Sequence, residues 1–318
     1  MDIENLKNII RHHYSDLLER EPDELGLEYY LKLLSQKKIS ESELIELIKS
    51  SPEYMEKNPS VNNEISFSEK KDYSRDSHII AMYRIKNESR WIRKSLESIS
   101  DICKEIIILD DGSTDETVKI CESFPQVTEI HSQKDLPFDE TRDKNKLLEI
   151  ALKRDPDFII TLDGDEVVMP NSKQRIFYEL NVLYPNVSLF EMKEIYVWDE
   201  PNRYRCDGIF NNTWSKKLFR LKNQPEDLQF ARTKFPGNAH CAAFPDNLIG
   251  GTQSVRSKVK ILHYGYYDEE LRKKKYNFLN KLDPNNTEFD GYRHIFSEES
   301  KFSGPNGMEF RLISEIEE

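Results

Sequence analysis

Acidic side chains gather at two places in the chain, each directly after a short apolar stretch. The first cluster is Asp110-Asp-Gly-Ser-Thr-Asp115, and the second is Asp163-Gly-Asp-Glu166. Carboxylates that share a cleft repel one another and raise each other's pKa unless a cation lies between them. Oxygen ligands of this kind suit Mg²⁺ or Mn²⁺, which usually share their coordination with substrate phosphates. These residues therefore predict a phosphorylated or nucleotide-linked substrate.

Either cluster alone has an ordinary structural explanation. Asp and Gly are common in turns, and Thr114 or Asp115 is suited to cap the helix expected after the first cluster. The spacing excludes an EF-hand calcium loop. The two clusters together, about fifty residues apart and each after an apolar stretch, favour a functional site.

The elements that must position these carboxylates alternate between strand and helix. Short apolar runs predict strands at 78–83, 105–109, 127–131 and 158–162. Between them, apolar residues at helical spacing predict helices at 92–99, 117–123 and 147–152. This alternation predicts an α/β fold with a mostly parallel sheet covered on both faces. Ligands of such sheets bind beyond the carboxyl ends of the strands, where both clusters would lie.

Composition divides the chain into three segments. Apolar residues at helical spacing predict a small all-α unit over residues 1–56. The polar, aperiodic stretch 57–76 is typical of a linker. Residues 77–318 form the expected α/β part, regular in its half 77–170 and strand-rich in its half 171–318.

Charge and composition exclude several classes of protein. The chain has 318 residues and a net charge of −12, without a long basic tract, so neither nucleic acid nor an anionic membrane is the expected main target. No apolar run approaches the ~20 residues of a membrane-spanning helix, and the first residues do not resemble a secretory signal. The four cysteines form no CxxC pair, which suits a reducing compartment. We expect a cytoplasmic protein, with peripheral association at the inner face of the membrane as an alternative.

Four segments resemble the nucleotide-binding half of a family 2 glycosyltransferase with the GT-A fold. They are Tyr83-Arg-Ile-Lys-Asn-Glu88, Ile107-Ile-Leu-Asp-Asp-Gly-Ser-Thr-Asp115, Phe138-Asp-Glu-Thr-Arg-Asp-Lys-Asn145 and Leu162-Asp-Gly-Asp-Glu166, the last in the form of a metal-binding DxD motif. His263-Tyr-Gly-Tyr266 resembles the end of one bacterial branch of these enzymes. The resemblance implies inverting transfer from a nucleoside diphosphate sugar, foremost a UDP-sugar, with Mn²⁺ or Mg²⁺. The implied acceptor is a glycan, a lipid-linked glycan or a protein, in bacterial surface glycan or glycoconjugate synthesis.

The same resemblance implies nucleotide contacts at the ends of the first two strands. Tyr83 and Arg84 would contact the base. Either Asp110 or Asp111 would accept a hydrogen bond from the base or the ribose.

The resemblance also implies a metal site beside the diphosphate. Asp163 would hold the ribose and the metal, and Asp165 would be the direct metal ligand. His263 is either a third ligand or a buried histidine bonded to the backbone. Arg142 and Lys144 would add positive charge near the diphosphate, although the family often has arginine where Lys144 stands, and lysine lacks the bidentate fork.

The catalytic base of such enzymes is a carboxylate that follows the DxD motif in the sequence. Three residues in the second half of the chain are candidates for it: Glu194, Asp199 and Asp207. Asp207 is the choice made here, although the Glu-Asp pair of many relatives is missing. His240 is a weaker candidate for a role at the acceptor.

Two basic stretches have both a binding and a structural interpretation. Trp214 with Lys216, Lys217 and Arg220 would line the sugar or phosphate site, but the same residues fit a strand of alternating exposure, which we favour. The four bases at 272–275 would approach the diphosphate or an anionic acceptor, but a solvated helix face is the preferred interpretation.

Two other functions compete with sugar transfer. A sugar nucleotidyltransferase shares a related sheet but usually carries a glycine-rich phosphate loop, and the segment after the first strand, 83–88, contains no glycine. A non-catalytic relative that binds carbohydrate or a partner is disfavoured by the intact DxD motif. The helical residues 1–56 resemble a short bacterial domain of unknown function. This resemblance implies either a docking module, which would recruit the acceptor or a protein partner, or a spacer.

Overall fold

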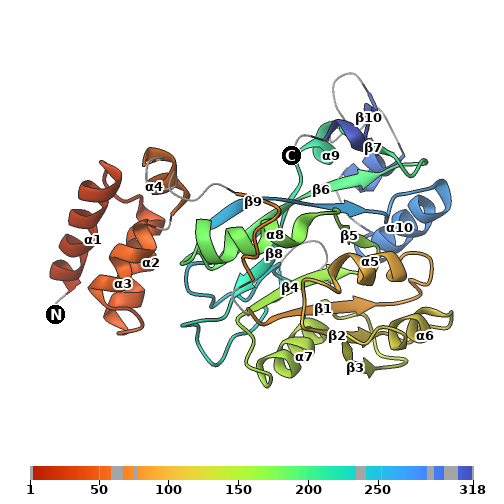
Figure 1. Cartoon of the computed structure of the whole chain (residues 1–318), viewed down its shortest axis with the longest axis horizontal. Coiled ribbons are helices and arrows are strands. Elements are labelled where there is room, and N and C mark those ends of the chain that lie inside the picture. The colour runs from red at the N-terminus through yellow and green to blue at the C-terminus, as the bar shows by residue number, and fades with distance from the viewer. Residues whose placement is uncertain are drawn as a thin grey trace.

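Four N-terminal helices lie beside a larger α/β body (Figure 1). The computed structural model describes residues 3–49, 51–58, 67–74, 77–233, 241–251, 253–284, 290–296 and 307–316. The four helices are α1 (Ile3–Leu18), α2 (Glu24–Ser35), α3 (Glu41–Lys49) and α4 (Pro52–Lys57). Ile10, Tyr14 and Leu18, spaced four residues apart on α1, pack with Leu44 of α3 in one apolar core. None of the helices in these ranges is long and apolar enough to cross a membrane.

The described strands form one ten-stranded sheet. They are β1 (Ile79–Ile85), β2 (Glu105–Asp110), β3 (Val127–Ser132), β4 (Phe158–Asp163), β5 (Glu166–Val168), β6 (Leu189–Val197), β7 (Arg203–Arg205), β8 (Trp214–Arg220), β9 (Ser254–His263) and β10 (Phe310–Leu312). The order along the sheet is β10-β7-β6-β8-β4-β1-β2-β3, while β9 pairs with β6 and with β5. Strands β3, β2, β1 and β4 run parallel, and β8 is antiparallel to β4 and β6.

Helices cover both faces of the parallel strands. Helices α5 (Ile92–Ile99), α6 (Thr117–Glu122) and α8 (Ser172–Tyr178) contribute to the core on one face, and α7 (Glu140–Leu152) contributes to the other. Ala81 and Tyr83 of β1 point to the first face, whereas Ile80 and Met82 point to the second. Because both faces are buried, the strand is a continuous apolar run. The α/β fold class predicted from the sequence is confirmed.

The remaining helical segments surround the second half of the sheet. They are α9 (Gly208–Asn211), α10 (Glu269–Leu282), the π-helical turn η2 (Glu179–Leu183) and the 3₁₀ turns η3 (Asp290–Ile295) and η4 (Ile313–Glu315).

Part of the stretch expected to be a linker packs on the α/β body. Tyr73 is 2% exposed, and its backbone N–H donates to Gln174 Oε1 at 3.1 Å. Its carbonyl accepts from Asn181 Nδ2 at 2.9 Å, and its ring contacts Tyr178 of α8. The polar composition of the stretch gave no sign of this contact. One aromatic residue changes the average hydropathy of a segment very little, but when it is buried it can fix the position of that segment. We therefore propose that the α/β body begins before Tyr73.

The helical unit contacts the α/β body at the segment that precedes β9. Ile249 packs against the core of the helical unit, and the backbone N–H of Gly250 donates to the hydroxyl of Tyr29. Gly250 has a φ of +79°, and a Cβ there would lie 2.8 Å from Ser188 Oγ, so only glycine fits this contact. This seam connects residues 1–56 to the strand that ends at His263.

Candidate active site

The two acidic clusters flank β1 at the carboxyl edge of the parallel strands. Ile85 of β1 stands opposite Asp110 of β2, and Arg84 stands opposite Asp163 of β4. Arg84 Nη2 also donates to Asp111 Oδ2 at 2.9 Å. The clusters therefore share one edge of the sheet, as the alternation of strands and helices predicts.

A buried network of charges holds Arg84 in place on the β2 side of this edge. The fully buried carboxylate of Asp143 accepts from Arg84 Nε at 2.7 Å and from Arg142 Nη2 at 2.7 Å. Gln133 Nε2 lies 3.0 Å from an oxygen of Asp111 and 3.0 Å from an oxygen of Asp143. Our sequence reasoning missed Asp143, whose position in the first turn of α7, facing the sheet, is the signal that identifies it.

Asp110 and Asp111 differ in their surroundings. Both oxygens of Asp110 accept the backbone N–H of Ser113, at 3.1 and 3.2 Å, so this carboxylate closes the turn after β2. Asp115 lies just before the next helix, and its Oδ1 accepts from the N–H of Thr117, the first residue of that helix, at 3.0 Å. Asp111 is the member of the cluster that binds the Arg84 side chain.

The DxD loop follows β4 and is shaped by Glu88. Asp163 is exposed, and its N–H donates to Glu166 Oε2 at 3.0 Å. The carbonyl of Asp165 accepts from the N–H of Tyr264 at 2.9 Å. A Cβ on Gly164 would lie 2.6 Å from Glu88 Cγ, so the loop packs directly on the glutamate of the Lys-Asn-Glu segment.

Negative charge accumulates around this loop. Burial, Asp165 and Asp163 together raise the pKa of Glu88 to about 9. Burial lowers the pKa of Lys275, but the nearby Tyr266, Asp165 and Asp163 outweigh it, and the pKa is raised. Three carboxylates grouped in this way, those of Glu88, Asp163 and Asp165, form a donor set that fits a hard divalent cation.

His263 ends β9 beside the DxD loop. It pairs in the sheet with Glu166, and its Nδ1 accepts from the N–H of Gly265 at 3.0 Å. Gly265 lies between the two side chains: a Cβ on it would lie 2.5 Å from His263 Cε1 and closer still to Asp165 Oδ2. The ring of His263 and the carboxylate of Asp165 are therefore close to the same position beside Gly265. Burial lowers the pKa of His263, which favours the neutral ring that can ligate a metal. The expected bond to the backbone is present, and the ring also faces a carboxylate.

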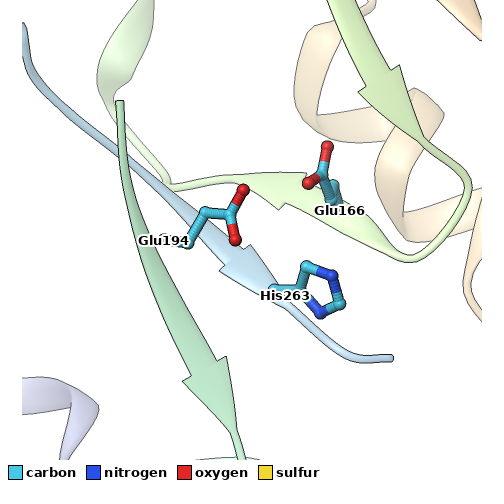
Figure 2. Close-up of side chains that lie close together, drawn as sticks. All are labelled: Glu166, Glu194 and His263. Carbon is cyan, nitrogen blue, oxygen red and sulfur yellow. The ribbon is translucent and has the colours of Figure 1, made fainter. Parts of the chain in front are cut away.

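Glu166, Glu194 and His263 point toward one another from β5, β6 and β9 (Figure 2). Their ligand atoms lie within 4.8 Å of one another, and all three residues are buried. Lys217 of β8 lies 2.6 and 2.8 Å from the two oxygens of Glu166 and 3.7 Å from Glu194 Oε1. The ammonium group therefore already supplies positive charge between these two glutamates.

The two glutamates of this cluster have opposite pKa shifts. Burial raises the pKa of Glu166 to about 8. Burial also acts on Glu194, but Lys217, His263 and the hydroxyls of Ser215 and Tyr196 outweigh it and lower its pKa to about 2. The sequence analysis named Lys217 as a residue that would line the sugar or phosphate site, but it did not predict the pairing with Glu166 and Glu194.

The family of the chain follows from a match over this body. Residues 79–243, more than half of the chain, match the model described as Glycosyl transferase family 2. The chain belongs to glycosyl transferase family 2. The family resemblance of the four sequence segments is thereby confirmed. Residues 5–58 match the Domain of unknown function DUF4214, as expected for the helical unit.

Several known proteins match parts of the chain. The SPbeta prophage-derived glycosyltransferase SunS of Bacillus subtilis is 30% identical over 192 residues, which are 58% of this chain and 39% of SunS. The uncharacterized protein Mb3815c of Mycobacterium bovis is 31% identical over 96 residues, which are 28% of this chain and 24% of that protein. The structure of S. aureus TarS 1–349 in complex with UDP is 15% identical with a TM-score of 0.40, covering 68% of each chain. The chain thus spans about two fifths of the length of SunS.

In this family 2 chain, Tyr83 lies away from the carboxyl edge. It is fully buried under α5, and its hydroxyl lies 3.0 Å from Ser95 Oγ. Because side chains alternate along a strand, Tyr83 and Arg84 point to opposite faces. The prediction that Tyr83 contacts the base is therefore wrong.

We expect Tyr83→Phe to affect stability and not nucleotide binding. Loss of one buried hydrogen bond lowers the free energy of unfolding by about 1 kcal/mol. Calorimetry with UDP and a urea unfolding curve measure the two effects separately. A tenfold loss of UDP affinity at unchanged stability would restore Tyr83 to the binding site.

Asp207, the expected base, lies in a buried ion pair. Arg205 Nε and Nη2 donate to its two oxygens at 2.6 and 2.8 Å, and both side chains are 0% exposed. The N–H of Glu309 donates to Asp207 Oδ1 at 3.1 Å, and Arg205 Nη1 donates to the carbonyl of His294 at 2.8 Å. Asp207 therefore joins β7 and the C-terminal segments, and its assignment as the base is corrected. The sequence shows the two residues but not their burial.

The other expected site residues take varied positions. Asp199 pairs with Arg272 at 2.9 Å, and Lys144 pairs with Glu140 at 2.8 Å. The segment Trp214–Arg220 is a strand, as preferred from its sequence, but its exposure does not alternate: Trp214 to Lys217 are all half-buried, and Leu218 and Phe219 are both buried. His240 lies outside the described residues.

Proposed function

We propose that this chain transfers a sugar, with inversion and with Mn²⁺ or Mg²⁺, from a nucleoside diphosphate sugar to an acceptor hydroxyl. A UDP-sugar is the proposed donor, and synthesis of a bacterial surface glycan or glycoconjugate is the proposed setting. The observation that carries the proposal is the convergence of both acidic clusters and His263 at one edge of the sheet. Membership of glycosyl transferase family 2 supports the reaction class.

The donor side of the proposed site lies along β1, β2 and α7. Arg84 and Asp111, fixed by Asp143, are proposed to face the base and ribose. Arg142, whose side chain is 36% exposed, and Lys144 are proposed to supply positive charge toward the diphosphate.

The cation of the proposed site would be held by Asp163, Asp165 and His263. Their oxygen and imidazole donors suit Mn²⁺ or Mg²⁺, and the charges of Asp165 and Asp163 add to the effect of burial in raising the pKa of Glu88. When bound, the cation would neutralise the charge that develops on the leaving diphosphate.

Inversion requires a carboxylate that takes the proton of the acceptor hydroxyl while this hydroxyl attacks the sugar opposite the leaving nucleotide. Asp207 is bound by Arg205, and Asp199 is bound by Arg203 and Arg272. Glu194 is the sequence candidate that lies beside His263, so we propose it as the carboxylate to test for this step.

A donor screen tests the proposal as a whole. The protein is incubated with a panel of nucleotide sugars, with Mn²⁺ or with EDTA, and nucleotide release is measured. We expect release of UDP from one donor class in Mn²⁺ and a loss of at least about 100-fold in EDTA. Formation of a nucleotide sugar from a nucleoside triphosphate and a sugar phosphate would instead show a nucleotidyltransferase. Absence of metal-linked nucleotide binding would show a non-catalytic relative.

The helical unit is proposed to bind the acceptor or a partner enzyme. Residues 1–56 contact the segment before β9, which ends at His263, so a glycan, lipid-linked or protein acceptor, or a partner enzyme, bound to the helices would lie next to the same body. A cytoplasmic location is part of this proposal.

A further inference from the structure

Helix α10 carries its four consecutive bases on two different faces. Lys273 and Lys274 are exposed and pair with Glu269 and Glu270, one turn earlier. Arg272 and Lys275, three residues apart and therefore on one face, point toward the α/β body. The interpretation preferred from the sequence, a solvated helix face, holds for Lys273 and Lys274 but not for Arg272 and Lys275.

Arg272 fixes the position of α10. Its side chain is buried, Nη2 lies 2.9 Å from Asp199 Oδ1, and Nη1 donates to the carbonyl of Tyr266 at 2.9 Å. Its guanidinium also lies 4.5 Å from the ring centroid of Trp198. Because these contacts of Arg272 fix the orientation of α10, they also orient Lys275, which follows one turn later on the same face.

Lys275 reaches the point that Asp165 and His263 share. A Cβ on Gly265 would lie 3.1 Å from Lys275 Nζ and 2.5 Å from His263 Cε1, with Asp165 Oδ2 closer still. Lys275 Nζ also lies 4.5 Å from the ring centroid of Tyr266. Its ammonium group interacts with the charges of Asp165, Asp163 and Glu194. The described chain thus provides its own cation beside the expected divalent one.

We propose that Lys275 is a built-in counter-cation, which balances the DxD carboxylates in the cation-free protein and binds the donor diphosphate once a divalent ion takes over that balance. The inference rests on the proposed function, since it needs both the ion and the diphosphate. Two positive charges beside one carboxylate repel each other, so Lys275 weakens binding of the ion alone. The diphosphate adds negative charge, and in its presence the same ammonium group strengthens binding.

The proposal predicts effects of opposite sign for one substitution. Lys275→Met is expected to tighten Mn²⁺ binding about tenfold in the absence of nucleotide, and to weaken UDP binding about tenfold at saturating Mn²⁺. Lys274→Met is the matched control on the same helix, and it is expected to leave both affinities within about twofold. A structural role alone would weaken both affinities or neither.

Electron paramagnetic resonance measures free Mn²⁺ in the presence of the full chain and so gives the Mn²⁺ affinity. Calorimetry measures the affinity for UDP. Circular dichroism checks that each variant is folded, and Lys275→Gln replaces the methionine variant if that variant does not fold. Unchanged or weaker Mn²⁺ binding by the folded variant overturns the inference, as does unchanged UDP binding. If the unsubstituted protein binds no Mn²⁺ at all, the proposed metal dependence is overturned instead.

Discussion

Asp165→Ala is expected to lower sugar transfer by about 10³-fold, with a parallel loss of Mn²⁺ binding. The carboxylate of Asp165 faces the ring of His263 at the end of β9. Loss of the charge that organises the cation removes electrostatic stabilisation of the leaving diphosphate, which is commonly the largest catalytic effect. Initial rates with the donor found in the screen, measured over a range of Mn²⁺ concentrations, test this expectation.

Asp115→Ala is the matched control for that variant. Asp115 belongs to the acidic cluster after β2, but its two oxygens accept the backbone N–H groups of Thr117, at the start of α6, and of Ser89. We expect a loss of about 1 kcal/mol in the free energy of unfolding and transfer within about threefold of the unsubstituted protein. Full transfer activity in Asp165→Ala would refute the metal site, whatever the control shows.

Asp207→Ala is expected to destabilise the fold by about 3–5 kcal/mol, because it leaves the guanidinium of Arg205 buried without its counter-charge. Urea unfolding measures this loss. Since a marginally stable domain has only about 5–15 kcal/mol in total, we expect low yields of this variant at 37 °C.

The double variant Arg205→Met with Asp207→Leu distinguishes an ion pair from a catalytic base. Removal of both charges leaves no buried ion unpaired, so much of the lost stability is expected to return. Transfer activity is expected to return with it. If the double variant is stable but inactive by more than about 10³-fold, Asp207 is the base after all.

The α/β order and the shared edge of the two acidic clusters were predictable from local patterns. An apolar run such as Ile106–Leu109 favours a buried strand, and the run from Ile159 to Leu162 does so again. Once both strands are parallel and lie on either side of β1, the residues after them must meet at one edge. This inference needs only the order of elements, which local sequence contains.

Local sequence patterns could not predict side-chain partners that come from distant segments of the chain. Arg205 and Asp207 stand two residues apart, but whether they form a buried pair depends on His294 and Glu309, which pack over them from the C-terminal segments. Asp143 likewise acquires its role only when α7 lies against β1 and β2. The interaction energy of two charges depends on their distance and burial, and neither quantity can be read from spacing in the chain.

Residue types and their order were therefore enough to predict the family, the sheet and the edge where charge collects. Which way each side chain points was settled by packing: the core under α5 takes Tyr83, and the anchored face of α10 turns Lys275 inward while Lys274 stays in solvent. A strand or helix can be assigned from a few neighbouring residues, but the environment of a side chain is built by elements far away in sequence, and it exists only after they have packed together.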